Sequence, residues 1–178
     1  MRNIQGETHL SAGLFLGAMT GISFEGGMGD ILISTLLGGV MAVLPDVDHP
    51  GSMTGRLIRP LSLYLEERWG HRDSPAHTAV FVFISSLTVA ALWLLPGHLA
   101  GLSTMAPGIA ALLGGTSHLV MDSVTRSGIK PWRYLPIPEK WRQKIYRGTL
   151  ESGKSALERV LACAGLLGAF FISIFKLT

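Results

Sequence analysis

The sequence is short of cysteine and of charged residues. One cysteine, Cys163, occurs among 178 residues, and Asp, Glu, Lys and Arg together make up 15% of the chain, against roughly 25% in an ordinary globular domain. A single cysteine excludes an intrachain disulfide scaffold, and so few charges argue against a disordered chain or a coiled coil. The formal net charge of +3 is too small to predict a nucleic-acid partner.

Apolar residues and glycine are in excess instead. Hydrophobic residues make up 48% of the chain, and 22 residues are glycine, about twice the average usage. A length of 178 residues fits one domain. We therefore predict a single membrane-embedded domain over residues 1–178, with an all-α fold.

Five apolar stretches are candidates for membrane-spanning helices. The clearest, Ala76–Leu95, has 20 residues and no charged group other than the flanking His77, which matches the about 20 residues that a spanning helix needs. The other four are Leu10–Phe24, Ile31–Leu44, Pro107–Met121 and Leu157–Leu177. The first two of these are short, so they either extend into their flanks or are partly re-entrant. The prediction is a multipass bundle of about five transmembrane helices.

The positive charges alternate with these stretches. Fourteen of the fifteen Lys and Arg residues lie before the first stretch, in the loops after the second and fourth, or at the start of the fifth, and Lys176 alone lies opposite. Cytoplasmic loops carry an excess of Lys and Arg. We therefore predict that the N-terminus is cytoplasmic and the C-terminus external.

Two segments on the predicted cytoplasmic side resemble interfacial structures. Arg56–Trp69 has leucines at helical spacing with charged residues between them, which is typical of an amphipathic helix lying on a membrane. Pro131–Tyr146 interleaves tryptophan and tyrosine with basic residues, a pattern typical of the headgroup region. The alternative for the second segment is a solvated basic loop.

Ionisable residues recur at the predicted cytoplasmic ends of the first four stretches. Such groups are costly at membrane depth and by default mark a functional site. They are His9, Asp46, Asp48, His49, His71, His77, His118 and Asp122. Chance would scatter them over both sides of the membrane, so the group favours a site even though any one residue has a structural explanation.

Helix periodicity places several of these residues on common faces. His118 and Asp122 are four residues apart and therefore share a face. Two further stripes at a spacing of four are His9, Gly13, Gly17 and Gly21, and Gly38, Ala42 and Asp46. Small residues let membrane helices approach closely, so we expect these stripes to face inward. His9, Asp46, His118 and Asp122 would then surround one buried pocket that faces the cytoplasm. Mixed imidazole and carboxylate ligands suit a divalent metal, Zn²⁺ first and Mn²⁺ or Fe as alternatives.

A second motif carries less weight. Gly148–Ser155 reads GTLESGKS and matches the phosphate-binding loop pattern of nucleotide hydrolases, but such a loop follows a buried strand, and the polar segment WRQKIYR precedes it here. We instead expect Ser155 and Glu158 to form a capping box at the start of the last helix.

The ionisable motifs together resemble a known family. Its pattern matches Thr8-His9, the LPDVDHP segment Leu44–Pro50, His71-Arg72 with His77, and His118 with Asp122, Thr125 and Gly128. This set is similar to that of the YdjM-type membrane-bound metal-dependent hydrolases, also described as LexA-binding and inner-membrane-associated. The resemblance implies a multipass protein of a bacterial inner membrane with a metal-dependent hydrolase site.

Two functions from different classes are compatible with this reading. The first is a hydrolase that cleaves a phosphoester such as a lipid headgroup, with membrane lipids as partners and no nucleic acid. The second is a non-enzymatic membrane protein in which the metal is structural, acting in regulation or partner binding. The predicted metal ligands are His9, Asp46, His77, His118 and Asp122, and the predicted catalytic residues are Asp48 and Arg72.

Overall fold

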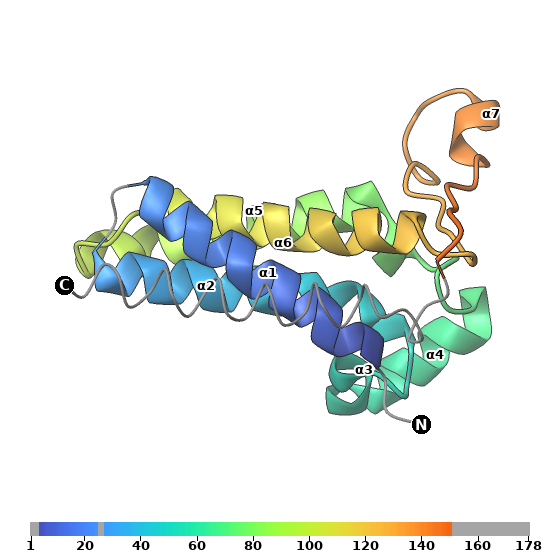
Figure 1. Ribbon diagram of the computed structural model, residues 1–178, viewed down its shortest axis with the longest axis horizontal. Helices are drawn as coiled ribbons and strands as arrows, with labels where there is room; N and C mark the ends of the chain where they lie inside the picture. Colours follow the sequence, from blue (N-terminus) through green and yellow to red (C-terminus); the bar gives the residue numbers. More distant parts are fainter. Residues whose placement is uncertain (1–3, 25–26, 151–178) are drawn as a thin grey trace.

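The computed structural model describes residues 4–24 and 27–150, and the regular elements in these ranges are all helices (Figure 1). They are α1 (Ile4–Ser23), α2 (Met28–Val43), η1 (Leu44–Asp48), α3 (Met53–Leu57), α4 (Arg59–Trp69), η2 (Pro75–His77), α5 (Ala79–Leu99), α6 (Ala106–Ser123) and α7 (Glu139–Arg142). The predicted all-α class is thus confirmed for the described residues. The predicted helix Leu157–Leu177 and the predicted capping box of Ser155 and Glu158 lie outside them.

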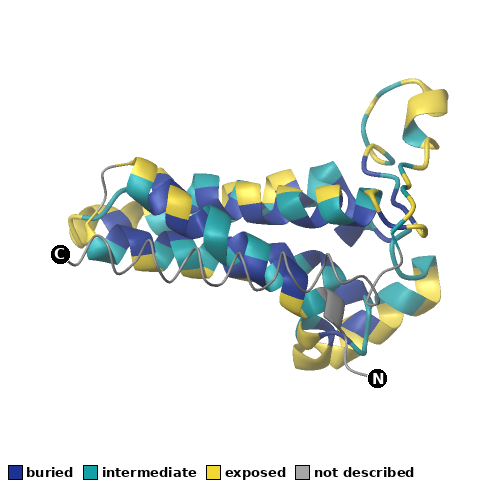
Figure 2. Ribbon diagram, viewed as in Figure 1, coloured by how far each residue is buried: buried dark blue, intermediate teal, exposed yellow. Residues whose placement is uncertain are grey.

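Four long helices form an elongated bundle (Figure 1). Helices α1, α2 and α6 all pack against one another, whereas α5 packs mainly on α6. Many apolar side chains of α5 are exposed, and its buried residues are confined to Val82, Ser86 and Gly97. Figure 2 shows exposed residues along the outer sides of the bundle and buried ones between the helices.

Glycines bring three helices into backbone contact. A Cβ atom added to Gly13 of α1 or to Gly114 of α6 would clash with the carbonyl oxygen of Gly38 in α2, and one added to Gly17 would clash with the carbonyl oxygen of Ser34. A Cβ at Gly21 would lie 2.6 Å from Cα of Ile31. The prediction that the two small-residue stripes face inward is therefore confirmed.

Two helical segments in the described ranges are long and apolar enough to cross a membrane. They are Met28–Asp48, which combines α2 with η1, and Ala79–Leu99, which is α5. The prediction of about five spans is not confirmed, because α1 and α6 are rich in glycine, serine, threonine and ionisable residues. Helix α1 does extend into its N-terminal flank, since it begins at Ile4 rather than at Leu10.

The predicted amphipathic helix Arg56–Trp69 is divided in two. Helix α3 ends at Leu57, and α4 begins at Arg59 with Pro60 in its first turn. Proline lacks a backbone N–H and is accepted in the first turn of a helix but not in its interior. The break therefore follows from Pro60.

The chain after α6 forms a lobe that projects from the bundle (Figure 1). Its base is held by two isolated β-bridges, Ile129 with Tyr146 and Thr125 with Leu150. The second bridge includes the first residues of the GTLESGKS segment, where Gly148 N–H donates to the carbonyl oxygen of Thr125 at 3.0 Å. Residues 148–150 thus pair with the chain after α6, and the remainder of the segment lies outside the described residues.

Candidate metal centre

The structure brings the five predicted metal ligands together at the end of the bundle that carries η1 and η2, which we call the site end. His9 comes from α1, Asp46 from η1, His77 from η2, and His118 and Asp122 from α6. Four of the five residues are buried, and the side chain of Asp46 is 13% exposed. The site is therefore assembled from four separate elements.

Three donor atoms of this group, from His77, His118 and Asp122, lie close together, and one from Asp46 lies next to the two histidines. Nε2 of His77 lies 3.1 Å from Nε2 of His118. Oδ2 of Asp122 lies 3.4 Å from the first of these nitrogens and 3.6 Å from the second. Oδ1 of Asp46 lies 3.8 Å from both. Metal–ligand bonds of about 2.0–2.1 Å in a tetrahedral zinc site separate the donor atoms by roughly 3.3–3.4 Å. The spacings among His77, His118 and Asp122 are therefore close to those around a single small cation.

The far nitrogen of each histidine ring is fixed by a hydrogen bond. Nδ1 of His77 donates to Oδ2 of Asp48 at 2.8 Å, and Nδ1 of His118 donates to the carbonyl oxygen of Ala42 at 2.7 Å. Such outer hydrogen bonds are the usual way in which metal-binding histidines are oriented. Both Nε2 lone pairs therefore face each other and two carboxylates, an arrangement that needs a positive charge between them.

Asp122 gives a second indication that this group could hold a cation. Its Oδ2 atom is buried and accepts no hydrogen bond among the described residues, and an unsatisfied buried polar atom is costly. A divalent ion between the four donors would satisfy it. The residues present thus fit a metal ion.

A proton on His77 is the competing source of positive charge. Burial lowers the pKa of His77, but the adjacent carboxylate of Asp122 and the hydrogen-bonded carboxylate of Asp48 outweigh this effect and raise the pKa to about 9. At neutral pH, a metal ion must therefore displace a proton from this ring.

Asp48 lies behind the four donors rather than among them. It is fully buried, and its second oxygen, Oδ1, accepts a hydrogen bond from Nδ1 of His71 at 2.7 Å. The hydroxyl of Ser74 also donates to Oδ2. Both carboxylate oxygens are thus occupied by side chains that surround the site.

His9 adjoins the four-donor group. Its ring stacks on that of His118 with centroids 3.9 Å apart, and its Nε2 lies 3.6 Å from Oδ1 of Asp122. His9, Asp46 and His118 also form a group whose donor atoms lie within 4.8 Å of one another. His9 therefore remains a candidate ligand, next to the tightest set.

Arg72 connects the metal group to the surface. Its Nη2 lies 3.0 Å from Oδ1 of Asp122, and its Nη1 donates to Oγ1 of Thr125 at 2.6 Å. Its backbone φ is +69°, a left-handed conformation that costs a non-glycine residue of order 1–3 kcal/mol. The contacts of the guanidinium group hold the residue in this conformation.

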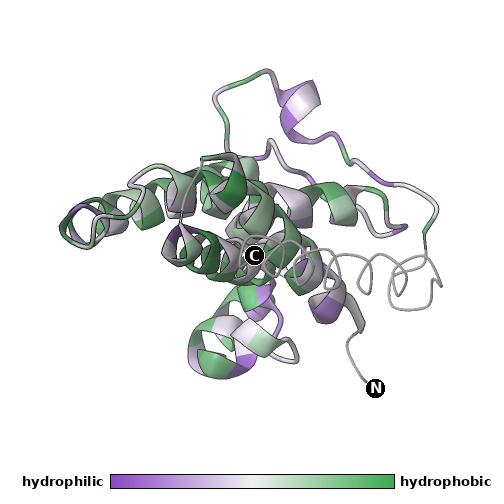
Figure 3. Cartoon of the chain, turned by 60° about the vertical axis from the view of Figure 1, so that its left-hand side comes forward, coloured by the Kyte–Doolittle hydropathy of each residue, from purple (hydrophilic) through white to green (hydrophobic). Residues whose placement is uncertain are grey.

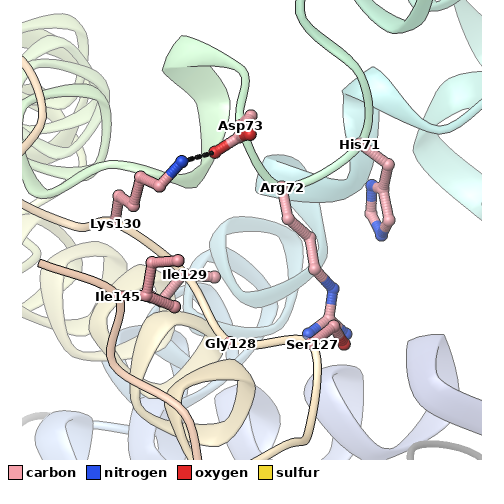
Figure 4. A pocket seen from close by; sticks show the side chains of 8 residues that line it. All are labelled: His71, Arg72, Asp73, Ser127, Gly128, Ile129, Lys130 and Ile145. Atoms are coloured by element: carbon pink, nitrogen blue, oxygen red, sulfur yellow. Dashed lines mark hydrogen bonds and ion pairs between the residues drawn. The ribbon is translucent and has the colours of Figure 1, made fainter. Parts of the chain in front are cut away.

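An open cavity of about 160 Å³ adjoins Arg72 (Figure 4). Two ion-paired residues on its wall, Lys130 and Asp73, lie 3.0 Å apart. Its lining residues are His71, Arg72, Asp73, Ser127, Gly128, Ile129, Lys130 and Ile145. Arg72, whose guanidinium group contacts Asp122, is thus part of the wall of this cavity.

Sequence reasoning did not assign a role to several residues at this site. Ser74 is buried against Asp48, and no spacing pattern marks it. Thr125 belongs to a family motif, but spacing alone does not predict its contact with Arg72. His49 lies at the edge, where Nδ1 is 3.5 Å from Oε1 of Glu66.

Comparisons with known proteins bear on this site. The family described as YdjM inner membrane protein matches residues 4–175 of the chain. The inner membrane protein YdjM of Escherichia coli (strain K12) is 30% identical over 137 residues, which cover 70% of this chain and 64% of the relative, and the same figures hold for YdjM of Shigella flexneri. The chain thus aligns with less than two thirds of the length of these relatives. The uncharacterized protein YvsG of Bacillus subtilis (strain 168) is 26% identical over 166 residues, covering 93% of this chain and 92% of the relative. No solved structure matches the chain.

Proposed function

Because the chain belongs to the YdjM inner membrane protein family, we propose that it is a metal-dependent hydrolase of a bacterial inner membrane. Its site would lie at the cytoplasmic face and cleave a phosphoester such as a lipid headgroup. The observation that carries the proposal is the convergence of donor atoms from His77, His118 and Asp122, with Asp46 next to both histidines.

His77, His118, Asp46 and Asp122 would hold the ion, and His9 would be a further ligand or a neighbour of it. Zinc is the first candidate because it accepts imidazole and carboxylate ligands in a tetrahedral arrangement, with Mn²⁺ or Fe as alternatives. When bound, such an ion supplies Lewis-acid chemistry and activates water.

Asp48 would act as a positioning residue. It holds Nδ1 of His77 and therefore directs Nε2 toward the ion. The sequence predicts a catalytic role for Asp48. We propose the positioning role instead, because His71, Ser74 and His77 already engage its two carboxylate oxygens.

Arg72 would bind the anionic oxygens of the substrate. Its guanidinium group has five N–H donors, of which Asp122 and Thr125 use part, and it borders the cavity that also contains Lys130. Arginine suits phosphate groups because its planar fork donates two parallel hydrogen bonds. A phosphoester in this cavity would lie beside Arg72, which contacts the candidate ligand Asp122.

The placement in the membrane is supported by α2 with η1 and by α5. These segments have the length and composition of membrane spans, and the donor atoms lie at one end of them, where the headgroups of a lipid bilayer would be. The ester of a lipid headgroup would therefore lie at the same depth in the membrane as the donor atoms.

The test is metal analysis followed by turnover. Full-length protein purified without chelator should contain a stoichiometric divalent metal, and it should release headgroup from one member of a phospholipid panel only when the metal is present. Loss of turnover on chelation and recovery on metal addition would support the proposal. Stoichiometric metal without turnover on the panel or on soluble phosphoesters would overturn it.

That last outcome would favour the second function, a structural metal in a non-enzymatic membrane protein. One observation supports this alternative: four protein donors can fill all the positions of a tetrahedral zinc ion, whereas catalytic zinc sites keep one position open. Spectroscopy of a cobalt-substituted protein distinguishes the two, since a closed site shows four protein ligands and no exchangeable water.

A further inference from the structure

The lobe over residues 131–146 has few buried residues and carries most of the exposed aromatic side chains of the site end. Trp132, Tyr134 and Trp141 are 37–44% exposed, and Ile145 is 48% exposed. Figure 3 shows the lobe with hydrophilic segments, in contrast to the mainly hydrophobic long helices. Large exposed rings on a projecting segment mark an interaction surface.

Cationic groups lie over these rings. Nζ of Lys144 lies 5.1 Å from the ring centroids of both Trp141 and Tyr146, and Nζ of Lys140 lies 5.8 Å from that of Trp141. The guanidinium carbon of Arg133 lies 5.8 Å from the ring centroid of Tyr134. Tyr134, Trp141 and Tyr146 thus each lie next to a positive charge.

The net charge of the lobe is positive. Glu139 is its only acidic residue, against the basic residues Arg133, Lys140, Arg142 and Lys144. Arg133 is paired with Asp73 at 3.4 Å. Among the described residues, Lys140, Arg142 and Lys144 form no ion pair, so their charges are available to a partner.

The base of the lobe lies at the start of an apolar helix. The N–H of Ala79, the first residue of α5, donates to the carbonyl oxygen of Pro131 at 2.8 Å. Since α5 has the length and composition of a membrane span, the lobe begins at the depth where that span would leave the hydrocarbon. The lobe then extends sideways from the bundle (Figure 1), along the plane of the headgroups.

We propose that this lobe binds the headgroups of anionic lipids. Aromatic rings with an apolar body and a polar edge settle at the membrane interface, and clusters of Lys and Arg next to a span are attracted to anionic lipids. The lobe combines both features on one surface. The proposal does not require that the metal site hydrolyses anything.

The test follows a spin label at Gln143, an exposed position of the lobe. Full-length Gln143→Cys protein, with Cys163→Ser to remove the native cysteine, is placed in nanodiscs of phosphatidylcholine alone or of phosphatidylcholine with phosphatidylglycerol. Accessibility of the label to a water-soluble relaxation agent is measured. We expect a severalfold lower accessibility in the discs that contain the anionic lipid. This difference should shrink at high salt, because the Debye length falls from about 10 Å at 0.1 M to about 3 Å at 1 M.

Two matched variants make the result specific to the lobe. Lys140→Glu with Lys144→Glu should abolish the difference between the two kinds of disc, whereas Lys140→Arg with Lys144→Arg should keep it. A label that is equally accessible in both lipids, or a difference that survives the charge reversal, would overturn the proposal and favour an acidic protein partner instead. The accessibility of the label does not depend on turnover. This experiment can therefore contradict lipid binding by the lobe without contradicting the hydrolase function, and the reverse also holds.

Discussion

Asp48 and His77 are joined by a hydrogen bond of 2.8 Å between Oδ2 and Nδ1, and the opposite nitrogen of the same ring faces His118, Asp46 and Asp122. The buried carboxylate thus fixes which ring nitrogen carries the hydrogen. With Nδ1 held in this way, Nε2 of His77 points toward the candidate metal ligands.

We predict that Asp48→Asn weakens metal binding by about 10–100-fold, the usual cost of losing an outer partner of a metal-binding histidine. The amide can present its NH₂ group to Nδ1 and so favour the wrong tautomer. Metal affinity measured by competition with a chromogenic chelator checks this. Asp30→Asn is the matched control, since Asp30 is a buried carboxylate at the opposite end that accepts hydrogen bonds from Gly27 and Ser103. Equal affinity in wild type and Asp48→Asn would contradict the positioning role.

Asp122→Ala should remove stoichiometric metal binding, because it deletes a donor atom and leaves three. Insertion into the membrane should be unaffected, since a buried carboxylate hinders insertion. Metal content of purified protein and membrane fractionation give the two readouts. His98→Ala, near the far end of α5, should retain the metal. Full metal content in Asp122→Ala would reduce Asp122 to a hydrogen-bond partner of Arg72.

Metal affinity should depend on pH through His77. Its pKa of about 9 means that the ring is protonated at neutral pH and that binding a metal releases a proton. The apparent affinity should therefore rise about tenfold per pH unit until the pH approaches 9 and then level off. In the metal-free protein, the protonated ring stabilises the fold fully below the ordinary pKa of 6.5, and this stabilisation is lost as the pH rises through about 9. Affinity that does not change between pH 7 and 9 would show that His77 is not a ligand.

Substitution of Gly17 should weaken the packing of α1 on α2 and so lower the stability of the fold. In Gly17→Ala, the new Cβ meets the carbonyl oxygen of Ser34, and overpacking of a tight contact costs typically about 1–3 kcal/mol. Gly6→Ala in the same helix meets nothing within 4 Å and should be neutral or stabilising by helix propensity. Thermal unfolding in detergent compares the two. Equal melting temperatures would mean that α1 does not pack on α2 through this face.

Sidedness follows from the distribution of positive charge. A reporter fused near Gln143 should be cytoplasmic, and reporters near Gly101 or at Thr178 should be external. Alkaline phosphatase and green fluorescent protein fusions measure this directly. The same side for Gln143 and Thr178 would exclude an odd number of spans between them and with it the five-span arrangement.

Periodicity predicted those features that depend on one helix at a time. The inward direction of Gly13, Gly17 and Gly38 could be read from a spacing of four, and so could the common face of His118 and Asp122. Because the ionisable residues lie at the same predicted end of each apolar stretch, the sequence also predicts that these faces meet at one end of the bundle.

Features that depend on the path of a loop could not be read in this way. The role of Asp48 requires the turn that returns His71 and Ser74 toward it, and this turn includes Arg72 in a left-handed conformation that the sequence does not signal. Pro60 could have indicated the break between α3 and α4, because proline marks the start of a helix.

The close contacts of Gly13 and Gly114 with Gly38 limit how far helix motion can displace the site. His9 lies four residues from Gly13, and His118 lies four residues from Gly114, so each side chain is attached about 6 Å along its helix from the crossing point. With a lever this short, a helix that tilts by about 5° moves its histidine by roughly 0.5 Å, which is close to the tolerance of about 0.5 Å for a positioned site. The helices touch at this crossing point through backbone atoms, so no change of side-chain rotamer can shift it. If the helices tilt about this point, their ends far from the site move more than the ends that carry the histidines.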